Sequence, residues 1–242
     1  MIAIIILSII LLLFFNFIIV NKINVDWKTL FKKGFPKHDD FFGLYCYEAP
    51  QGEGKTYSAV KFTIDMFVKY NYRIITNLKS FVDQNKDINN MLYIEDIFEL
   101  IDYCKEHQEE RKIILFDEIF TVLQKNVKNP RMHEILSFLA QLRKRSIIFV
   151  TTAQNWSEIP KDFRDFCRFK VHCHMFNVPL INRAFIFNQM YDGYNVKWSD
   201  ELQDFEGPLL SSKFSKANLQ VAHSYDTFET IRPNYFRSKE RS

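Results

Sequence analysis

The chain has few cysteines and a small net charge, and each of these features makes certain classes of protein less suitable as an interpretation. Four cysteines occur among 242 residues. Their scattered positions do not form the spacing of a disulfide framework, which favours a reducing compartment. The formal net charge is +3. This excess of positive charge is too small to indicate nucleic-acid binding from the overall electrostatics of the chain. The length suits one domain of ordinary size with a small addition.

The first twenty residues lack charged side chains altogether. Residues 2–20 are apolar except for Ser8 and Asn16, and a helix of that length spans a bilayer core. A cleaved signal peptide would need a basic start, a shorter apolar stretch and a small-residue cleavage site, and the sequence has none of these. We therefore expect a transmembrane anchor over residues 1–21.

The segment that follows, residues 22–40, contains five lysines and reads as a basic juxtamembrane linker. The positive-inside rule then predicts a single pass through the inner (cytoplasmic) membrane, with the amino terminus outside and the rest in the cytoplasm. Trp27, Leu30 and Phe31 have helical spacing among these lysines. They fit an interfacial helix on anionic lipid and an ordinary basic linker equally well.

A glycine-rich segment directly after the apolar residues 41–47 carries the strongest chemical signal. Its order of strand, loop ending in Gly-Lys-Thr, and amphipathic stretch predicts a P-loop. Lys55 would reach the β- and γ-phosphates of a nucleotide, and the Thr56 hydroxyl would bind Mg²⁺. Ala49 stands where the full pattern has glycine, which is acceptable if that residue keeps a negative φ. The predicted nucleotide-binding residues are Ala49, Pro50, Gln51, Gly52, Glu53, Gly54, Lys55, Thr56 and Tyr57.

A second signal is the acidic pair that ends the apolar run at residues 113–116. Carboxylates at the end of a buried parallel strand suit Walker-B chemistry. Asp117 would hold the Mg²⁺ shell and Glu118 would polarise the attacking water. Gln154 follows another apolar strand and would sense the γ-phosphate, although an ordinary loop position is the alternative. The predicted catalytic residues are Lys55, Glu118 and Gln154, and the predicted Mg²⁺ ligands are Thr56 and Asp117.

The alternation of apolar strands and amphipathic helices predicts an α/β fold. We expect a P-loop NTPase of the RecA-like (ASCE) type, with a parallel sheet flanked by helices, over residues 41–198. Residues 81–90 read as irregular, and residues 160–169 as a short helix that begins at proline. Residues 199–242 read as a polar extension that is partly disordered.

A zinc site is suggested by Cys167, His172, Cys173 and His174 but is not expected. In a strand the two histidines share one face and Cys173 points to the other, so one tetrahedral site does not use all three.

These motifs resemble the zonular occludens toxin (Zot) family, the assembly ATPases of filamentous phages, within the FtsK/HerA class. The resemblance covers residues 41–190. It rests on the P-loop, Thr76-Asn77 after a strand, Asp117-Glu118, and the stretch that leads to Gln154. Tyr225-Asp226-Thr227 adds to it. Familiar Zot-like proteins carry their anchor after the ATPase domain, whereas the predicted anchor here is amino-terminal.

The resemblance implies ATP and Mg²⁺ as cofactors and a homo-oligomeric ring that drives phage assembly and extrusion or DNA translocation. Possible partners are DNA and other phage or secretion assembly proteins. In such rings an arginine reaches the neighbouring γ-phosphate, and the candidates are Arg143, Arg145, Arg164 and Arg168. Two alternatives stay open: a DNA packaging or conjugative pump of the same class, and an ATP-binding membrane scaffold with little hydrolysis.

Overall fold

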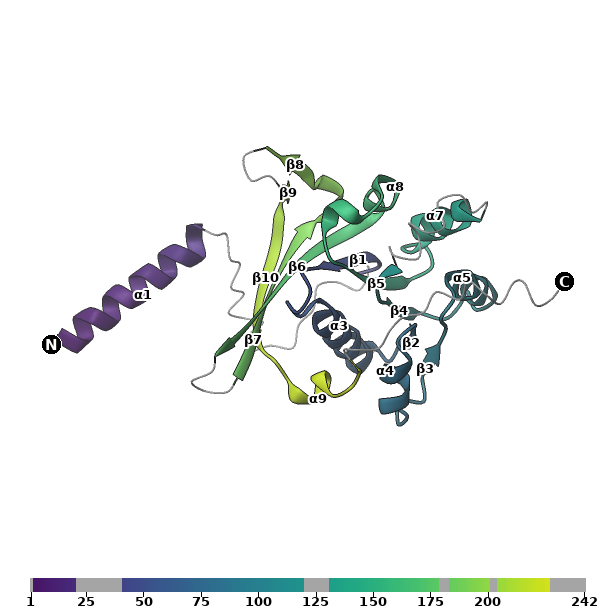
Figure 1. Cartoon of the computed structure of the whole chain (residues 1–242), viewed down its shortest axis with the longest axis horizontal. Coiled ribbons are helices and arrows are strands. Elements are labelled where there is room, and N and C mark those ends of the chain that lie inside the picture. Colours follow the sequence, from purple (N-terminus) through teal and green to yellow (C-terminus); the bar gives the residue numbers. More distant parts are fainter. Residues whose placement is uncertain (1, 21–40, 120–130, 179–182, 201–203, 227–242) are drawn as a thin grey trace.

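The computed structural model describes residues 2–20, 41–119, 131–178, 183–200 and 204–226. Its main feature is an eight-stranded sheet with the strand order β10-β7-β6-β1-β5-β4-β2-β3 (Figure 1). The strands from β6 to β3 run parallel to their neighbours, and β7 and β10 add an antiparallel edge. The sheet strands are β1 (Gly43–Glu48), β2 (Arg73–Thr76), β3 (Met91–Tyr93), β4 (Lys112–Phe116), β5 (Ile147–Ala153), β6 (Cys167–Val178), β7 (Arg183–Asp192) and β10 (Leu209–Lys216).

Helices cover both faces of the central strands, as expected for apolar strands that are buried on both sides. Every residue of β1, β4 and β5 is buried. On one face Leu44 and Cys46 of β1 pack with α5 and α7, and on the other Tyr45 and Tyr47 pack with α3, α4 and α9. The helices are α3 (Lys55–Tyr70), α4 (Lys79–Gln84), α5 (Ile97–Glu106), α7 (Met132–Gln141), α8 (Lys161–Arg164) and α9 (Leu219–Ala222).

The strand order decides which loops meet. β5 lies between β1 and β4, so the carboxyl ends of β1, β5, β4 and β2 share one edge of the sheet. The loop after β1 and the acidic pair after β4 therefore face each other across the end of β5. This edge is where ligands bind in open α/β sheets. The α/β fold with a mostly parallel sheet, predicted from the alternating pattern, is confirmed.

The structure differs from the sequence predictions in three segments. Residues 81–90 include part of α4, whose Phe81 is fully buried. The helix expected over residues 160–169 is only α8, because β6 begins at Cys167. Beyond residue 198, where the sequence placed a polar extension, β10 pairs with β7 in the main sheet. A second small sheet joins β8 (Lys197–Ser199) to β9 (Asp204–Glu206). Two short 3₁₀ turns, η2 (Trp156–Glu158) and η4 (Gly193–Asn195), follow β5 and β7.

The membrane anchor predicted over residues 1–21 is corrected. Ile2–Val20 form α1, but no helix in the described part of the chain is long and apolar enough to cross a membrane. The single-pass topology in the inner membrane, with an outer amino terminus, is therefore withdrawn.

Other expectations fall outside the described residues. They are the basic linker over residues 22–40 with Trp27, Leu30 and Phe31, the position of Thr227, and the disordered tail at the carboxyl terminus.

A buried ion pair joins β1 to β6 directly before the glycine-rich loop. Lys170 Nζ lies 2.9 Å from Glu48 Oε1, and the two side chains are 5% and 7% exposed. Lys170 Nζ also donates a hydrogen bond to the Phe205 carbonyl at 2.9 Å, and His172 Nδ1 lies 3.3 Å from the same Glu48 oxygen. These contacts offset part of the cost of removing both charges from water.

We predict that Lys170→Met lowers the free energy of unfolding by about 3–5 kcal/mol, because it leaves the Glu48 carboxylate buried without its cation. The double variant Glu48→Leu with Lys170→Met should recover most of that loss. Urea denaturation measures both. The control is Lys213→Met, which removes an exposed pair with Asp65 at 3.6 Å and should cost less than about 1 kcal/mol. A double variant as unstable as the sum of its single variants would contradict this account.

Candidate active site

The loop between β1 and α3 is shaped by two glycines with positive φ. Gly52 has a φ of 87° and Gly54 a φ of 79°, a region that residues with a Cβ rarely adopt. A Cβ on Gly54 would also lie 2.7 Å from Met175 Cε, whereas one on Gly52 would meet nothing within 4 Å. Gly54 is the N-cap of α3, so Lys55 and Thr56 open the helix at its positive end.

Ala49 fits the position at which the full motif has glycine. Outside glycine, positive φ occurs in the described residues only at Asn71, Glu118 and Ser146. Ala49 is 1% exposed, and its N–H donates to the Ala153 carbonyl at 3.3 Å. Ala49 therefore does not have a positive φ, so alanine can replace the glycine of the full motif at this position.

The acidic residue after β4 lies against the first turn of α3. Thr56 Oγ1 is 3.5 Å from Asp117 Oδ1 and 3.4 Å from Asp117 Oδ2. Lys55 and Asp117 are each 8% exposed. The structure therefore brings together Lys55, Thr56 and Asp117, which are 62 residues apart at most in the chain, around one buried carboxylate.

Two side chains that the sequence analysis did not place in the site hold Asp117 from either side. Thr152 at the end of β5 donates to Asp117 Oδ1 at 2.5 Å and accepts from the Glu118 N–H at 3.1 Å. Asn77 after β2 accepts from the Asp117 N–H at 2.8 Å and donates to its carbonyl at 3.0 Å. The sequence feature that could have indicated Thr152 and Asn77 is their position: each is a polar residue at the carboxyl end of a buried strand that neighbours β4. Asn77 entered the sequence analysis only through the family resemblance.

Glu118 and Gln154 lie at the same edge. Glu118 has a φ of 50°, a left-handed conformation that costs a residue with a Cβ about 1 kcal/mol or more. The surrounding structure keeps the residue in this conformation, here through the hydrogen bond from the Glu118 N–H to the Thr152 hydroxyl. Gln154 is exposed and follows β5 directly, between the loop and the acidic pair. The Glu118 side chain is half-buried and that of Gln154 is exposed.

The histidines considered for zinc contact the glycine-rich loop and β1 instead. His174 Nδ1 lies 2.8 Å from Glu53 Oε2, and the same oxygen accepts from the Met175 N–H at 3.1 Å. His172 faces Glu48. Cys167 and Cys173 are buried, and the described residues contain no group of three or more His, Cys, Asp or Glu suited to a metal ion. Glu53 thus ties the loop to β6.

The four arginines considered for a trans role lie elsewhere. Arg143 and Arg168 line a pocket that also includes Phe42, at the amino-terminal start of β1. Arg145 donates to Gln141 Oε1 through Nε at 3.1 Å and Nη2 at 2.8 Å. The Arg164 guanidinium lies 4.7 Å from the centre of the Phe205 ring.

Burial controls the charge of Asp117. It raises the pKa of this carboxyl from 3.8 to about 6, against the lowering effects of Thr152, Lys55 and Thr56. A divalent cation would stabilise the ionised form. Mg²⁺ binds through one or two carboxylates, phosphate oxygens and water, and a hydroxyl beside a single buried carboxylate fits that donor set. Thr56 and Asp117 are therefore suited to Mg²⁺.

We predict that Asp117→Asn stabilises the ligand-free protein at pH 8. A folded-state pKa above the unfolded value means that the charged side chain opposes folding. Its cost is absent below about pH 4 and complete above about pH 6. Removing the charge should raise the free energy of unfolding by about 2–3 kcal/mol at pH 8. Urea denaturation at pH 8 and pH 4 tests this. Equal destabilisation at both pH values would contradict the prediction.

The family model described as "Zonular occludens toxin (Zot)" matches residues 44–193. No curated protein matches. The N-terminal domain of zonular occludens toxin from Neisseria meningitidis is 14% identical with a TM-score of 0.45, covering 76% of this chain and 100% of that one. The flagellar accessory protein FlaH from Methanocaldococcus jannaschii is 14% identical with a TM-score of 0.44, covering 61% and 77%.

The matched residues run from β1, before the glycine-rich loop, to the end of β7. They include the loop, Asn77, the acidic pair and Thr152, and they make up more than half of the chain. The chain therefore belongs to the zonular occludens toxin (Zot) family.

Proposed function

We propose that this chain is an ATPase that binds ATP with Mg²⁺ and hydrolyses it. One observation carries the proposal: Thr56 at the start of α3 lies 3.4 Å from the buried carboxylate of Asp117 at the end of β4. A hydroxyl and a carboxylate at that spacing, next to a glycine-rich loop and a buried lysine, are the groups that bind a nucleoside triphosphate with Mg²⁺ in P-loop proteins.

The loop residues Ala49 to Tyr57 would bind the phosphates. Backbone N–H groups at the start of α3 favour an anion because the helix end is positive. The Lys55 ammonium would lie against the β- and γ-phosphate oxygens. Mg²⁺, held by Thr56 and Asp117, would supply positive charge to the same oxygens.

Glu118 would position the attacking water and accept its proton, as the water attacks the γ-phosphorus in line with the leaving oxygen. Its N–H bond to Thr152 fixes its backbone while its side chain is only half-buried. Gln154 is exposed at the end of the intervening strand and would orient the same water.

Membership of the Zot family supports a role in phage assembly and extrusion or in DNA translocation. In this role subunits would form a ring, with DNA or other assembly proteins as partners. A packaging or conjugative pump would use the same chemistry. The scaffold alternative loses its main argument, because Ala49 fits the loop without the positive φ that would need glycine.

We predict that Glu118→Gln lowers ATP turnover by about 10²- to 10⁴-fold, because the amide cannot accept the proton of the attacking water. ATP binding should remain, since Lys55, Thr56 and Asp117 are unchanged. Phosphate release measures turnover, and fluorescent ATP measures binding. Turnover is measured without DNA, with single-stranded DNA and with duplex DNA.

The matched control is Glu99→Gln, which makes the same change at an exposed position of α5 and should leave turnover unchanged. Stimulation by DNA would favour translocation, and turnover that ignores DNA would favour an assembly ATPase driven by protein partners. ATP binding without turnover in the unaltered protein would reject the ATPase proposal and favour the scaffold.

A further inference from the structure

Two neighbouring pockets share a lining residue, and the first lies at the start of β1 and β6, at the opposite end of these strands from the glycine-rich loop. The first has a volume of about 360 Å³ and is bordered by Phe42, Gly43 and Arg168. The second, of about 270 Å³, is bordered by α8 and β8. Tyr194 lines both pockets, and 62% of its surface is exposed.

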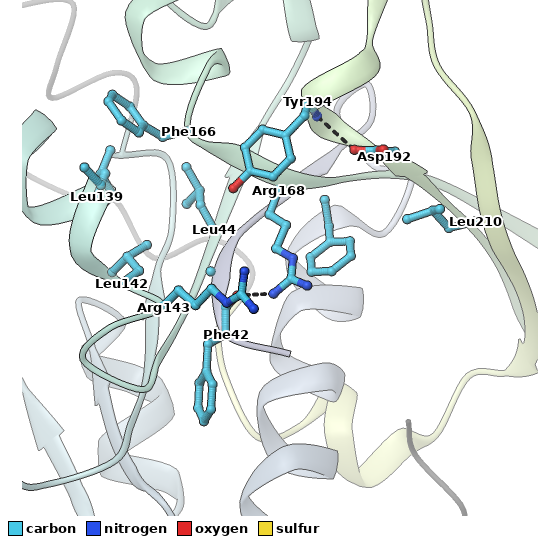
Figure 2. Close-up of a pocket in the computed structure, with 13 residues that line it drawn as sticks. Phe42, Leu44, Leu139, Leu142, Arg143, Phe166, Arg168, Asp192, Tyr194 and Leu210 are labelled. Carbon is cyan, nitrogen blue, oxygen red and sulfur yellow. Dashed lines mark hydrogen bonds between the residues drawn. The ribbon is translucent and has the colours of Figure 1, made fainter. Parts of the chain in front are cut away.

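Two arginines converge on the first pocket. Figure 2 shows the side chains of Arg143, from the turn after α7, and Arg168, from β6, reaching toward each other beside Phe42. Arg168 Nη1 donates to the Phe42 carbonyl at 2.8 Å, and its guanidinium lies 5.0 Å from the centre of the Phe169 ring. Gly43, with a φ of 136°, leaves room for this arginine, since a Cβ there would be 3.1 Å from Arg168 Cδ.

Neither guanidinium is neutralised by a carboxylate among the described residues, within 4.0 Å. Asp192 also lines the first pocket. Its carboxylate accepts from the Tyr194 N–H at 3.1 Å and from Asn195 Nδ2 at 2.7 Å. It therefore holds the turn that presents Tyr194 (Figure 2).

The second pocket continues the same chemistry. Its lining includes Lys161, Arg164 and Lys197 together with Trp198, and one acid, Asp165. Trp198 is 50% exposed. The linings of the two pockets together contain five cationic side chains and two carboxylates, an excess of three positive charges among the lining residues.

We propose that this surface binds single-stranded DNA. We call it the basic aromatic surface, and it consists of Arg143, Lys161, Arg164, Arg168, Tyr194 and Lys197. Cationic side chains would contact successive phosphates, and a base would stack on the Tyr194 ring, as in proteins that bind single strands without sequence preference. A duplex hides the faces of its bases and would gain only the phosphate contacts. The choice of DNA rests on the proposed function, whereas the preference for a single strand rests on the exposed ring.

The test is fluorescence anisotropy of the full chain with labelled oligodeoxythymidine and with a duplex of equal length. Single strands should bind more tightly than the duplex. Tyr194→Ala should weaken single-strand binding about 5- to 150-fold, whereas Tyr194→Phe should bind as well as the unaltered protein. The double variant Arg143→Gln with Lys197→Gln should reduce the slope of log affinity against log salt by about 0.7 for each phosphate contact removed.

The matched control is Lys213→Gln, which removes one cation on β10, outside both pockets, and should change neither affinity nor slope. Equal affinity for single strands and duplex, or no effect of Tyr194→Ala, would overturn the proposal. ATP binding and turnover are measured on the same preparations. Loss of DNA binding with normal turnover would reject this surface alone, whereas missing turnover with intact DNA binding would reject the ATPase.

Discussion

The geometry of the site depends on the hydroxyl of Thr152. It donates to the Asp117 carboxylate and accepts from the Glu118 N–H, so one side chain of β5 fixes both acidic residues that follow β4. Asn77 completes the arrangement from β2 by pairing with the backbone of Asp117. Three adjacent strands are thereby locked at their carboxyl ends. Because Asp117 is held in this way, it can stay buried beside Thr56 in spite of the desolvation that raises its pKa.

The glycine-rich loop is supported from the other side by the long strand β6. Glu53 of the loop contacts His174 and the Met175 N–H, while Glu48 before the loop pairs with Lys170. Of the residues that suggested a metal site in the sequence, His174 thus contacts the loop and His172 contacts Glu48 of β1. The two halves of the site are therefore fixed separately: Thr152 and Asn77 hold the acidic pair, and β6 holds the loop. The basic aromatic surface lies at the far end of the same strands β1 and β6, so one sheet carries both sites.

The central strands and the loop could be predicted from sequence because buried parallel strands are continuous apolar runs and the loop has a fixed pattern. Other features leave weaker signals. β10 is a half-exposed edge strand rich in serine and lysine, and α4 is short, with Phe81 as its one buried residue. The role of Thr152 depends on β5 lying between β1 and β4, and strand order is not visible in local sequence. The anchor prediction followed hydropathy alone and is not supported by the described helices.

The central claim is that Thr152 organises Asp117 for a nucleotide with Mg²⁺. Isothermal titration calorimetry with ATP, in Mg²⁺ and in EDTA, tests this claim on the unaltered chain and on Thr152→Val, which keeps the shape of the side chain but removes its hydroxyl. We expect the unaltered chain to bind ATP more tightly with Mg²⁺, and the variant to lose most of that difference while still binding ATP in EDTA. The account would be contradicted if the unaltered chain bound ATP with the same affinity in Mg²⁺ and in EDTA. It would also be contradicted if Thr152→Val kept the full difference between the two affinities.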